Sequence, residues 1–179
     1  MILPADRNLA LTGFMTAGKS LVGQDLSRRT GMPLVDIDQL ICEIERMTVH
    51  DIFRTRGEPY FRRIESQLLH QLCQGNGQVI SCGGGTVLDP ANLEVLRSRC
   101  VTVWLRVSEE AVLRRLEDPT SPQRPLLEPL EPGIVVHKLL VQREPLYAQA
   151  DFVVETDGRT VQEVADAIIR ELGIPTTGA

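Results

Sequence analysis

The sequence lacks the features that mark several large classes of protein. It has no excess of basic residues, because 24 acidic side chains against 19 lysines and arginines give a net charge of −5 and a pI of about 5.3. This balance argues against a general nucleic-acid binder, which usually presents a basic surface. No apolar stretch approaches the roughly 18 residues of a membrane span. We therefore expect neither a nucleic-acid partner nor a membrane partner.

Metal and redox patterns of cysteine and histidine are also missing. The four cysteines include no C-x-x-C pair, and the three histidines lie far apart without metal-ligand spacing. The first residues, MILPADRN, reach proline and charged residues too early for a signal peptide. These observations predict a reduced cytoplasmic protein with buried thiols. No long exposed apolar stretch demands a partner chain, so a monomer is the expectation.

Short apolar runs alternate with longer amphipathic stretches along the chain. Helical spacing is clearest after Thr160, which together with Glu163 forms a predicted capping box. The apolar runs are predicted to be five buried strands, at 8–13, 33–38, 78–85, 101–107 and 151–156. This alternation predicts an α/β fold with a five-stranded parallel sheet and helices on both faces. A length of 179 residues suits a single domain.

Residues 13–20 read GFMTAGKS and match G-x-x-x-x-G-K-[ST], the pattern of a loop that wraps nucleotide phosphates. Its glycines permit a tight turn whose N–H groups point at phosphate oxygens, and the following helix presents its positive end. Lys19 would add a mobile charge on the outer phosphates, and Ser20 would place a hydroxyl on Mg²⁺. A plain glycine-containing turn is the alternative. Thr16 stands where many small kinases have glycine, so the loop depends on a conformation that threonine can adopt without strain.

Asp36 and Asp38 end the second predicted strand. Residues two apart on a strand share a face, and the carboxyl edge of a parallel sheet is where open α/β folds bind ligands. One carboxylate would hold magnesium through water, and the other would accept a proton from a hydroxyl. The alternative is that Asp38 caps the next helix and Asp36 is solvated.

Glycines follow the third predicted strand, in the sequence SCGGG. Such a run lets a ligand approach the backbone closely, although a flexible turn is an alternative explanation. Arginines stand at Arg62 and Arg63 in YFRRIE, at Arg124 in the aperiodic proline-rich segment 117–133, and at Arg143 in QREPLY. Arginine suits two-point capture of carboxylate or phosphate. Together with the phosphate loop, these residues suggest an anionic acceptor and a lid at 117–133.

These motifs resemble the shikimate kinase family in their order and approximate spacing. The resemblance covers about residues 8–172 and involves GFMTAGKS, DID, FRRIE, SCGGG, RPLL and REPLY. It implies a P-loop fold of the nucleoside-monophosphate-kinase type. It also implies ATP-dependent, Mg²⁺-assisted phosphorylation of the 3-hydroxyl of shikimate, a step towards chorismate and the aromatic amino acids. Within one domain, 1–179, residues 39–63 would be a substrate-binding insertion and 117–133 the lid.

The resemblance further implies a role for individual residues. The catalytic residues would be Lys19, Asp38 and Arg124, with Asp38 as the base for the 3-hydroxyl. Shikimate would be bound by Asp38, Arg62, Gly83, Gly84, Gly85 and Arg143, the two arginines holding its carboxylate. Mg²⁺ would be held by Ser20 and, through water, by Asp36. ATP would contact Gly13, Thr16, Ala17, Gly18, Lys19, Ser20, Leu21, Arg115 and Arg124. Arg115 is similar to the family arginine that stacks on adenine, although the stretch from Arg115 to Arg124 is longer than in compact relatives.

Two other functions stay open at this point. Another small-metabolite kinase of this fold, such as a gluconate kinase, would need the phosphate loop and the lid but not the DID, FRRIE and SCGGG motifs. A kinase-like binding or regulatory protein that has lost turnover would lack an equivalent of Lys19, Asp38 or Arg124. All three residues are present.

Overall fold

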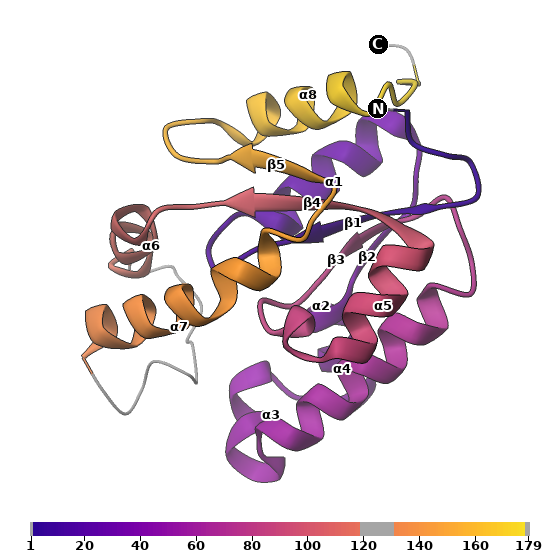
Figure 1. Cartoon of the computed structure of the whole chain (residues 1–179). Coiled ribbons are helices and arrows are strands. Elements are labelled where there is room, and N and C mark those ends of the chain that lie inside the picture. Colours follow the sequence, from indigo (N-terminus) through magenta and orange to yellow (C-terminus); the bar gives the residue numbers. More distant parts are fainter. Residues whose placement is uncertain (1, 119–130, 178–179) are drawn as a thin grey trace.

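A central parallel sheet organises the computed structural model, which describes residues 2–118 and 131–177 (Figure 1). The strands are Asn8–Thr12 (β1), Leu34–Asp36 (β2), Val79–Ser81 (β3), Cys100–Arg106 (β4) and Phe152–Glu155 (β5). They form one sheet in the order β2-β3-β1-β4-β5, and every neighbouring pair is parallel. The predicted α/β class and five-stranded parallel sheet are therefore confirmed.

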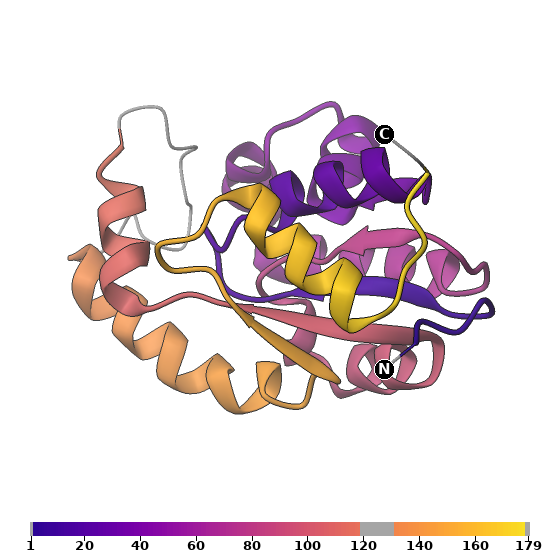
Figure 2. The same ribbon diagram turned by 90° about the horizontal axis from the view of Figure 1, so that it is seen from above.

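Helices cover both faces of this sheet, as Figure 1 and the view from above in Figure 2 show. On one face, α1 (Lys19–Thr30) and α8 (Val161–Glu171) pack against each other. The remaining helices are α2 (Ile37–Glu45), α3 (Val49–Arg56), α4 (Glu58–Leu72), α5 (Pro90–Arg99), α6 (Glu109–Leu116) and α7 (Pro132–Tyr147), with a 3₁₀ turn η1 (Thr86–Leu88). Of these, α4, α5 and α7 lie on the opposite face of the sheet (Figure 1).

Several predicted boundaries differ from the structure. The second strand ends at Asp36, because the Asp36 side chain accepts a hydrogen bond from the Gln39 N–H at 3.1 Å and caps α2. The third strand ends at Ser81, before the glycines. Residues 39–63 are mainly helical, but α4 continues beyond them to Leu72. Of the predicted lid, 117–133, the last two residues belong to α7, and residues 119–130 lie outside the described residues.

Local signals in the sequence set the helix ends. α1 ends at Gly31, whose φ of 75° is left-handed and whose N–H donates to the Ser27 carbonyl at 2.9 Å. At the start of α8, the Thr160 Oγ1 accepts from the Glu163 N–H at 3.2 Å. The Glu163 carboxylate accepts from the Thr160 N–H at 2.7 Å. The predicted capping box is confirmed.

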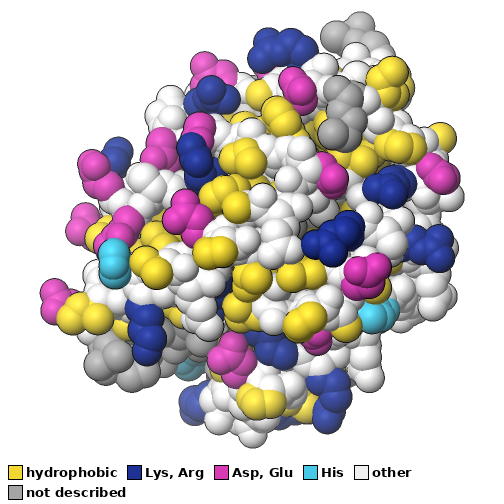
Figure 3. All heavy atoms as spheres, viewed as in Figure 1, with side chains coloured by type: hydrophobic (Ala, Val, Ile, Leu, Met, Phe, Trp, Pro, Cys, Tyr) yellow, Lys and Arg dark blue, Asp and Glu magenta, His cyan; other side chains and the backbone are white. Residues whose placement is uncertain are grey.

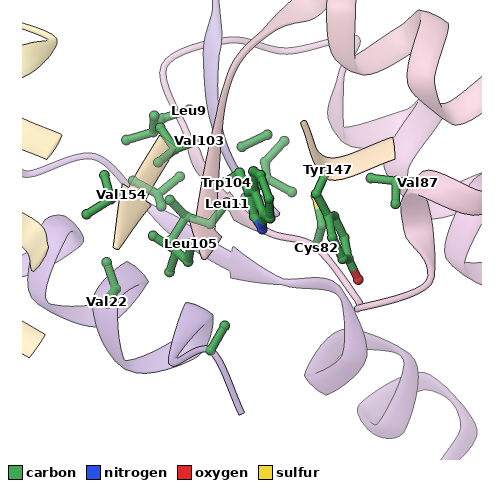
Figure 4. Close-up of a cluster of buried hydrophobic side chains, with 14 of the residues drawn as sticks. Leu9, Leu11, Val22, Cys82, Val87, Val103, Trp104, Leu105, Tyr147 and Val154 are labelled. Atoms are coloured by element: carbon green, nitrogen blue, oxygen red, sulfur yellow. The ribbon is translucent and has the colours of Figure 1, made fainter. Parts of the chain in front are cut away.

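The hydrophobic core fills both sides of the sheet. β1 is buried along its whole length, which explains why its sequence is a nearly continuous apolar run. Figure 4 shows Leu9, Val103 and Val154 on the side of α1, and Trp104 with Tyr147 on the other side. Burial on both sides holds the strands in register, and this fixes the positions of the loops at their carboxyl ends.

The described part of the chain contains no helix that is long and apolar enough to cross a membrane. On the face seen in Figure 3, acidic and basic side chains are interspersed with apolar ones. That face therefore offers no continuous basic surface of the kind that follows a nucleic-acid backbone.

Removal of the capping box tests how much it contributes to stability at the start of α8. Thr160→Ala should lower the free energy of unfolding by about 1 kcal/mol, because N–H groups at the start of α8 lose their partners. Urea denaturation measures the change. Ser98→Ala is the control, because Ser98 Oγ donates to the carbonyls of Glu94 at 2.8 Å and Val95 at 3.2 Å, both within its own helix. Its effect should stay within about 0.5 kcal/mol, as for most exposed positions. Equal losses in the two variants would show that the box has no specific effect.

Candidate active site

Three chemically active loops follow three neighbouring strands. The phosphate loop follows β1, Asp36 and Asp38 lie at and just after the end of β2, and the glycines follow β3. β3 pairs with both β1 and β2, so the loops lie side by side at the carboxyl edge of the sheet. They line a cleft of about 430 Å³ whose wall includes Thr16, Lys19, Ser20, Asp36, Asp38, Gly84 and Arg115. Open α/β folds bind their ligands at this place.

The phosphate loop turns through residues with positive φ. Gly13 has a φ of 136°, and a Cβ there would lie 2.5 Å from the Leu105 carbonyl oxygen, so only glycine fits. Gly18, with a φ of 88°, directly precedes α1, and the first turn of that helix lines the cleft. Lys19 Nζ donates to the carbonyls of Gly13 at 2.8 Å and Phe14 at 2.9 Å. The loop thus combines a helix N-terminus with a lysine charge, which suits phosphate.

Thr16 departs from a relaxed loop geometry. Its φ of 63° is left-handed, a conformation that costs an ordinary L-residue about 1–2 kcal/mol and is an outlier for a β-branched one. Its Oγ1 is buried without a hydrogen-bond partner among the described residues. Its carbonyl accepts a hydrogen bond from Arg115 Nη1 at 2.7 Å. The expectation that threonine adopts this conformation without strain is not met.

A hydroxyl and a carboxylate meet beside the phosphate loop. Ser20 Oγ donates to Asp36 Oδ2 at 2.6 Å. Both are hard oxygen ligands of the kind that Mg²⁺ prefers. Among the residues that the structure describes, no group of three or more His, Cys, Asp or Glu side chains could hold a metal. A site with few protein ligands still fits Mg²⁺, which usually keeps waters and binds substrate phosphates.

Asp38 lies in the first turn of α2, with its carboxylate in the cleft. The prediction that both aspartates share a strand face is wrong because β2 ends at Asp36, but both side chains line the cleft. Asp38 Oδ1 is buried and has no hydrogen-bond partner among the described residues. Burial and, after it, the negative charge of Glu65 raise the pKa of Asp38 to about 6, although the charge of Lys19 opposes the shift. Such a carboxylate is ionised at neutral pH and is a stronger base than an exposed one.

Two arginines from different helices converge on the glycine loop. A Cβ on Gly85 would collide with the guanidinium of Arg62, which comes from α4. Arg143, from α7, is only 3% exposed, and its Nη1 donates to the Gly84 carbonyl at 3.2 Å. Arg143 Nε is buried and has no partner among the described residues. The two cations therefore lie at one loop, an arrangement suited to a carboxylate ligand.

Glu65 is a site residue that sequence reasoning missed. It is 1% exposed, and it accepts hydrogen bonds from Arg62 Nη1 at 2.8 Å and from Thr86 Oγ1 at 2.6 Å. A Cβ on Gly83 would collide with the Glu65 carboxylate, so glycine is needed there to admit a side chain of the protein itself. Arg62 and Glu65 are three residues apart on one helix, and this spacing could have predicted their ion pair from the sequence.

Tyr147 was also missed. Its hydroxyl donates to the Gly84 carbonyl, the same oxygen that Arg143 contacts, and its ring stacks beside Trp104 (Figure 4). Tyr147 lies four residues after Arg143 on α7, so the two side chains share a helix face. Two residues of α7 thus donate hydrogen bonds to the Gly84 carbonyl.

The structure brings most of the predicted site residues together. Those around the cleft or the glycine loop are Thr16, Gly18, Lys19, Ser20, Leu21, Asp36, Asp38, Arg62, Gly83, Gly84, Gly85, Arg115 and Arg143. Arg124 lies outside the described residues. Cys82 is buried, and burial raises the pKa of its thiol, so it stays protonated. This agrees with the expectation of buried thiols.

Known proteins are similar to this chain in both sequence and fold. The family model described as "Shikimate kinase" matches residues 15–173. A shikimate kinase of Thermodesulfovibrio yellowstonii is 39% identical over 92% of this chain and 94% of that protein. A solved structure of shikimate kinase from Acinetobacter baumannii in complex with shikimate has a TM-score of 0.87 and 32% identity, covering 93% of this chain and 92% of that one.

A gluconokinase from Sinorhizobium meliloti, by contrast, has a TM-score of 0.61 with 14% identity over 94% of this chain and 93% of that one, so it shares the fold alone. The family model and the relatives therefore favour shikimate kinase over gluconate kinase, the other kinase function that the sequence left open. The chain belongs to the shikimate kinase family.

Proposed function

We propose that the protein transfers the γ-phosphoryl group of ATP to the 3-hydroxyl of shikimate and releases shikimate 3-phosphate and ADP. The observation that carries this proposal is the convergence of Arg62 and Arg143 on a glycine loop next to a phosphate loop and Asp38. A carboxylate-bearing polyol suits the two cations and the base. The related protein from Acinetobacter baumannii, named as a complex with shikimate, supports the choice of acid. The product lies on the route to chorismate and the aromatic amino acids.

On the acceptor side, Arg62 and Arg143 bind the carboxylate by two-point contacts. Gly83, Gly84 and Gly85 bring backbone groups close to the ring. Asp38 binds ring hydroxyls and takes the proton of the reacting hydroxyl, for which a pKa of about 6 keeps it ionised at neutral pH. We assign residues 39–63 to this side of the site.

On the donor side, Lys19 stabilises the charge that moves with the phosphoryl group. Arg124, carried by the proposed lid at 117–133, also contacts the ATP phosphates, and closure of the lid keeps water from accepting the phosphoryl group. The adenine end lies towards Arg115. The residues that contact ATP are Gly13, Thr16, Ala17, Gly18, Lys19, Ser20, Leu21, Arg115 and Arg124.

Ser20 and, through water, Asp36 are the residues that would hold Mg²⁺. When bound, the ion supplies positive charge against the phosphate oxygens. The protein acts chiefly by positioning its two substrates and by neutralising charge. We further propose that it works as a monomer in the cytoplasm.

A substrate panel tests the proposed function. ADP release should depend on shikimate and should be absent with gluconate, because gluconate places its carboxylate on a flexible chain instead of a ring. A coupled ADP assay with purified protein, ATP and Mg²⁺ measures this. Release with gluconate but not with shikimate would favour the alternative kinase, and no release with any acceptor would favour a binding protein.

The carboxylate clamp predicts selectivity for the free acid. Arg62→Lys should lower kcat/KM for shikimate by about 10- to 100-fold, because lysine cannot reproduce the planar two-point contact and charged hydrogen bonds contribute about 1.5–3 kcal/mol. The methyl ester of shikimate should be a similarly poor substrate of the unaltered enzyme. Arg63→Lys is the control, because the Arg63 guanidinium instead lies 5.1 Å from the Tyr60 ring centroid. Equal efficiency on acid and ester would remove the clamp from the mechanism.

The pKa of Asp38 predicts the acid limb of activity. Below pH about 6, kcat/KM should fall about tenfold per pH unit, whereas a carboxyl with the ordinary pKa of 3.8 would stay ionised. A pH–rate profile measures the midpoint. A flat profile down to pH about 4 would contradict a base with a raised pKa.

The raised pKa of Asp38 also predicts that the ionised carboxylate, which activity needs, lowers the stability of the fold. Because the folded-state pKa lies above 3.8, protonated Asp38 stabilises the fold at low pH, and this contribution is lost as the pH rises through about 6. Asp38→Asn should therefore abolish turnover yet raise the free energy of unfolding at neutral pH by up to about 3 kcal/mol, with the gain shrinking towards low pH. Asp25→Asn is the control of opposite sign, because hydrogen bonds from Arg28 and Arg29 lower the pKa of Asp25 in spite of its burial. A less stable Asp38→Asn protein at neutral pH would contradict this account.

A further inference from the structure

The strained residue of the phosphate loop has a specific support. Of the described residues other than glycine, only Thr16 and Arg46 have a positive φ. Arg46 ends a helix, where a left-handed residue is common. Thr16 stands inside the phosphate loop and has a branched side chain and a buried hydroxyl without a described partner. Strain of this kind persists only where the surroundings enforce it.

The enforcing contact comes from Arg115, in the last turn of α6. Its Nη1 donates to the Thr16 carbonyl at 2.7 Å, and its Nη2 donates to the Thr156 carbonyl at 3.4 Å. Thr156 is 3% exposed and follows β5, and its own N–H donates to the Arg106 carbonyl at 2.9 Å. One guanidinium therefore ties the phosphate loop to the rigid edge of the sheet.

This tie fixes a peptide plane in the loop. The Thr16 carbonyl and the Ala17 N–H belong to one planar trans peptide, so they point in opposite directions. The Ala17 N–H donates to the Phe14 carbonyl at 3.3 Å. Rotation of Thr16 towards a relaxed conformation would turn this plane and break both hydrogen bonds. The loop N–H groups that face phosphate would move with it.

We propose that Arg115 is a positioning residue that holds Thr16 in the left-handed conformation, so that nucleotide affinity depends on Arg115 through Thr16. The inference goes beyond a contact between Arg115 and adenine, and it rests on the proposed use of this loop for ATP. Glycine at position 16 would adopt the same backbone without strain and would not need the arginine. The dependence on Arg115 is thus specific to a threonine at this position.

A double-mutant cycle tests the coupling. Arg115→Met removes the guanidinium, and Thr16→Gly removes the strain. Arg115→Met should weaken ADP binding about tenfold in the native background, as the loss of one charge-assisted hydrogen bond predicts. In the Thr16→Gly background the same change should weaken binding by less than about threefold. Titration calorimetry with ADP and Mg²⁺ measures all four proteins.

Three further variants sharpen the cycle. Thr16→Ala removes the hydroxyl but keeps a Cβ in the left-handed conformation, so it should retain the full dependence on Arg115. Arg114→Met is the matched control, because the Arg114 side chain is 70% exposed and pairs with Glu110 on its own helix. It should leave ADP affinity unchanged. Arg115→Lys keeps the charge but loses the two-carbonyl bridge, and it replaces Arg115→Met if that protein does not fold.

An equal loss from Arg115→Met in both backgrounds would overturn the proposal, because Arg115 would then act only through its direct contact with the nucleotide and not through Thr16. ADP binding is read without an acceptor. A failure of shikimate turnover is therefore distinguishable from a failure of this inference.

Discussion

The ion pair between Arg62 and Glu65 is the interaction on which the acceptor side of the site depends. Glu65 is buried, and a buried carboxylate is stable only when it is paired and hydrogen-bonded. Arg62 and Thr86 both donate hydrogen bonds to it, and its bond with Arg62 fixes the direction of the Arg62 guanidinium. The same carboxylate lies close to Asp38 and contributes to its raised pKa. It also requires glycine at position 83. The orientation of the Arg62 guanidinium, the basicity of Asp38 and the need for glycine at position 83 thus all depend on Glu65.

The cleft gathers like charges that would otherwise separate. Burial and the negative charges of Glu65 and Asp36 raise the energy of the ionised Asp38 carboxylate, while Lys19 and Arg62 lower it. The balance leaves a proton acceptor that is ionised but poorly satisfied, since its Oδ1 has no described partner. Functional sites commonly hold groups in states that the rest of the fold has to offset. Here the offset comes from the strands β1, β3 and β4, which are buried along almost their whole length.

Much of the fold and most of the site could be predicted from the sequence, because both rest on short-range patterns. The five strands and the capping box of α8 follow from apolar spacing and side-chain chemistry that act within a few residues. The phosphate loop was predictable because glycine and lysine have few other reasons to occur at that spacing. The strand limit at Asp36 was not, since an aspartate can either end a strand or cap a helix, and tertiary contacts decide between them. The Thr16–Arg115 contact joins residues 99 apart and leaves no periodic trace.

The order of the strands has a consequence for the way this protein is made. β1 is the central strand, yet its two neighbours come much later in the chain: Leu9 pairs with Val79, and Asn8 pairs with Cys100. During synthesis from the N-terminus, the phosphate loop leaves the ribosome long before either neighbour exists. A nascent chain that stops short of β4 has β1 as an unpaired edge, which is a template for association with other chains. Nucleotide recognition therefore appears late, when more than half of the chain has been made.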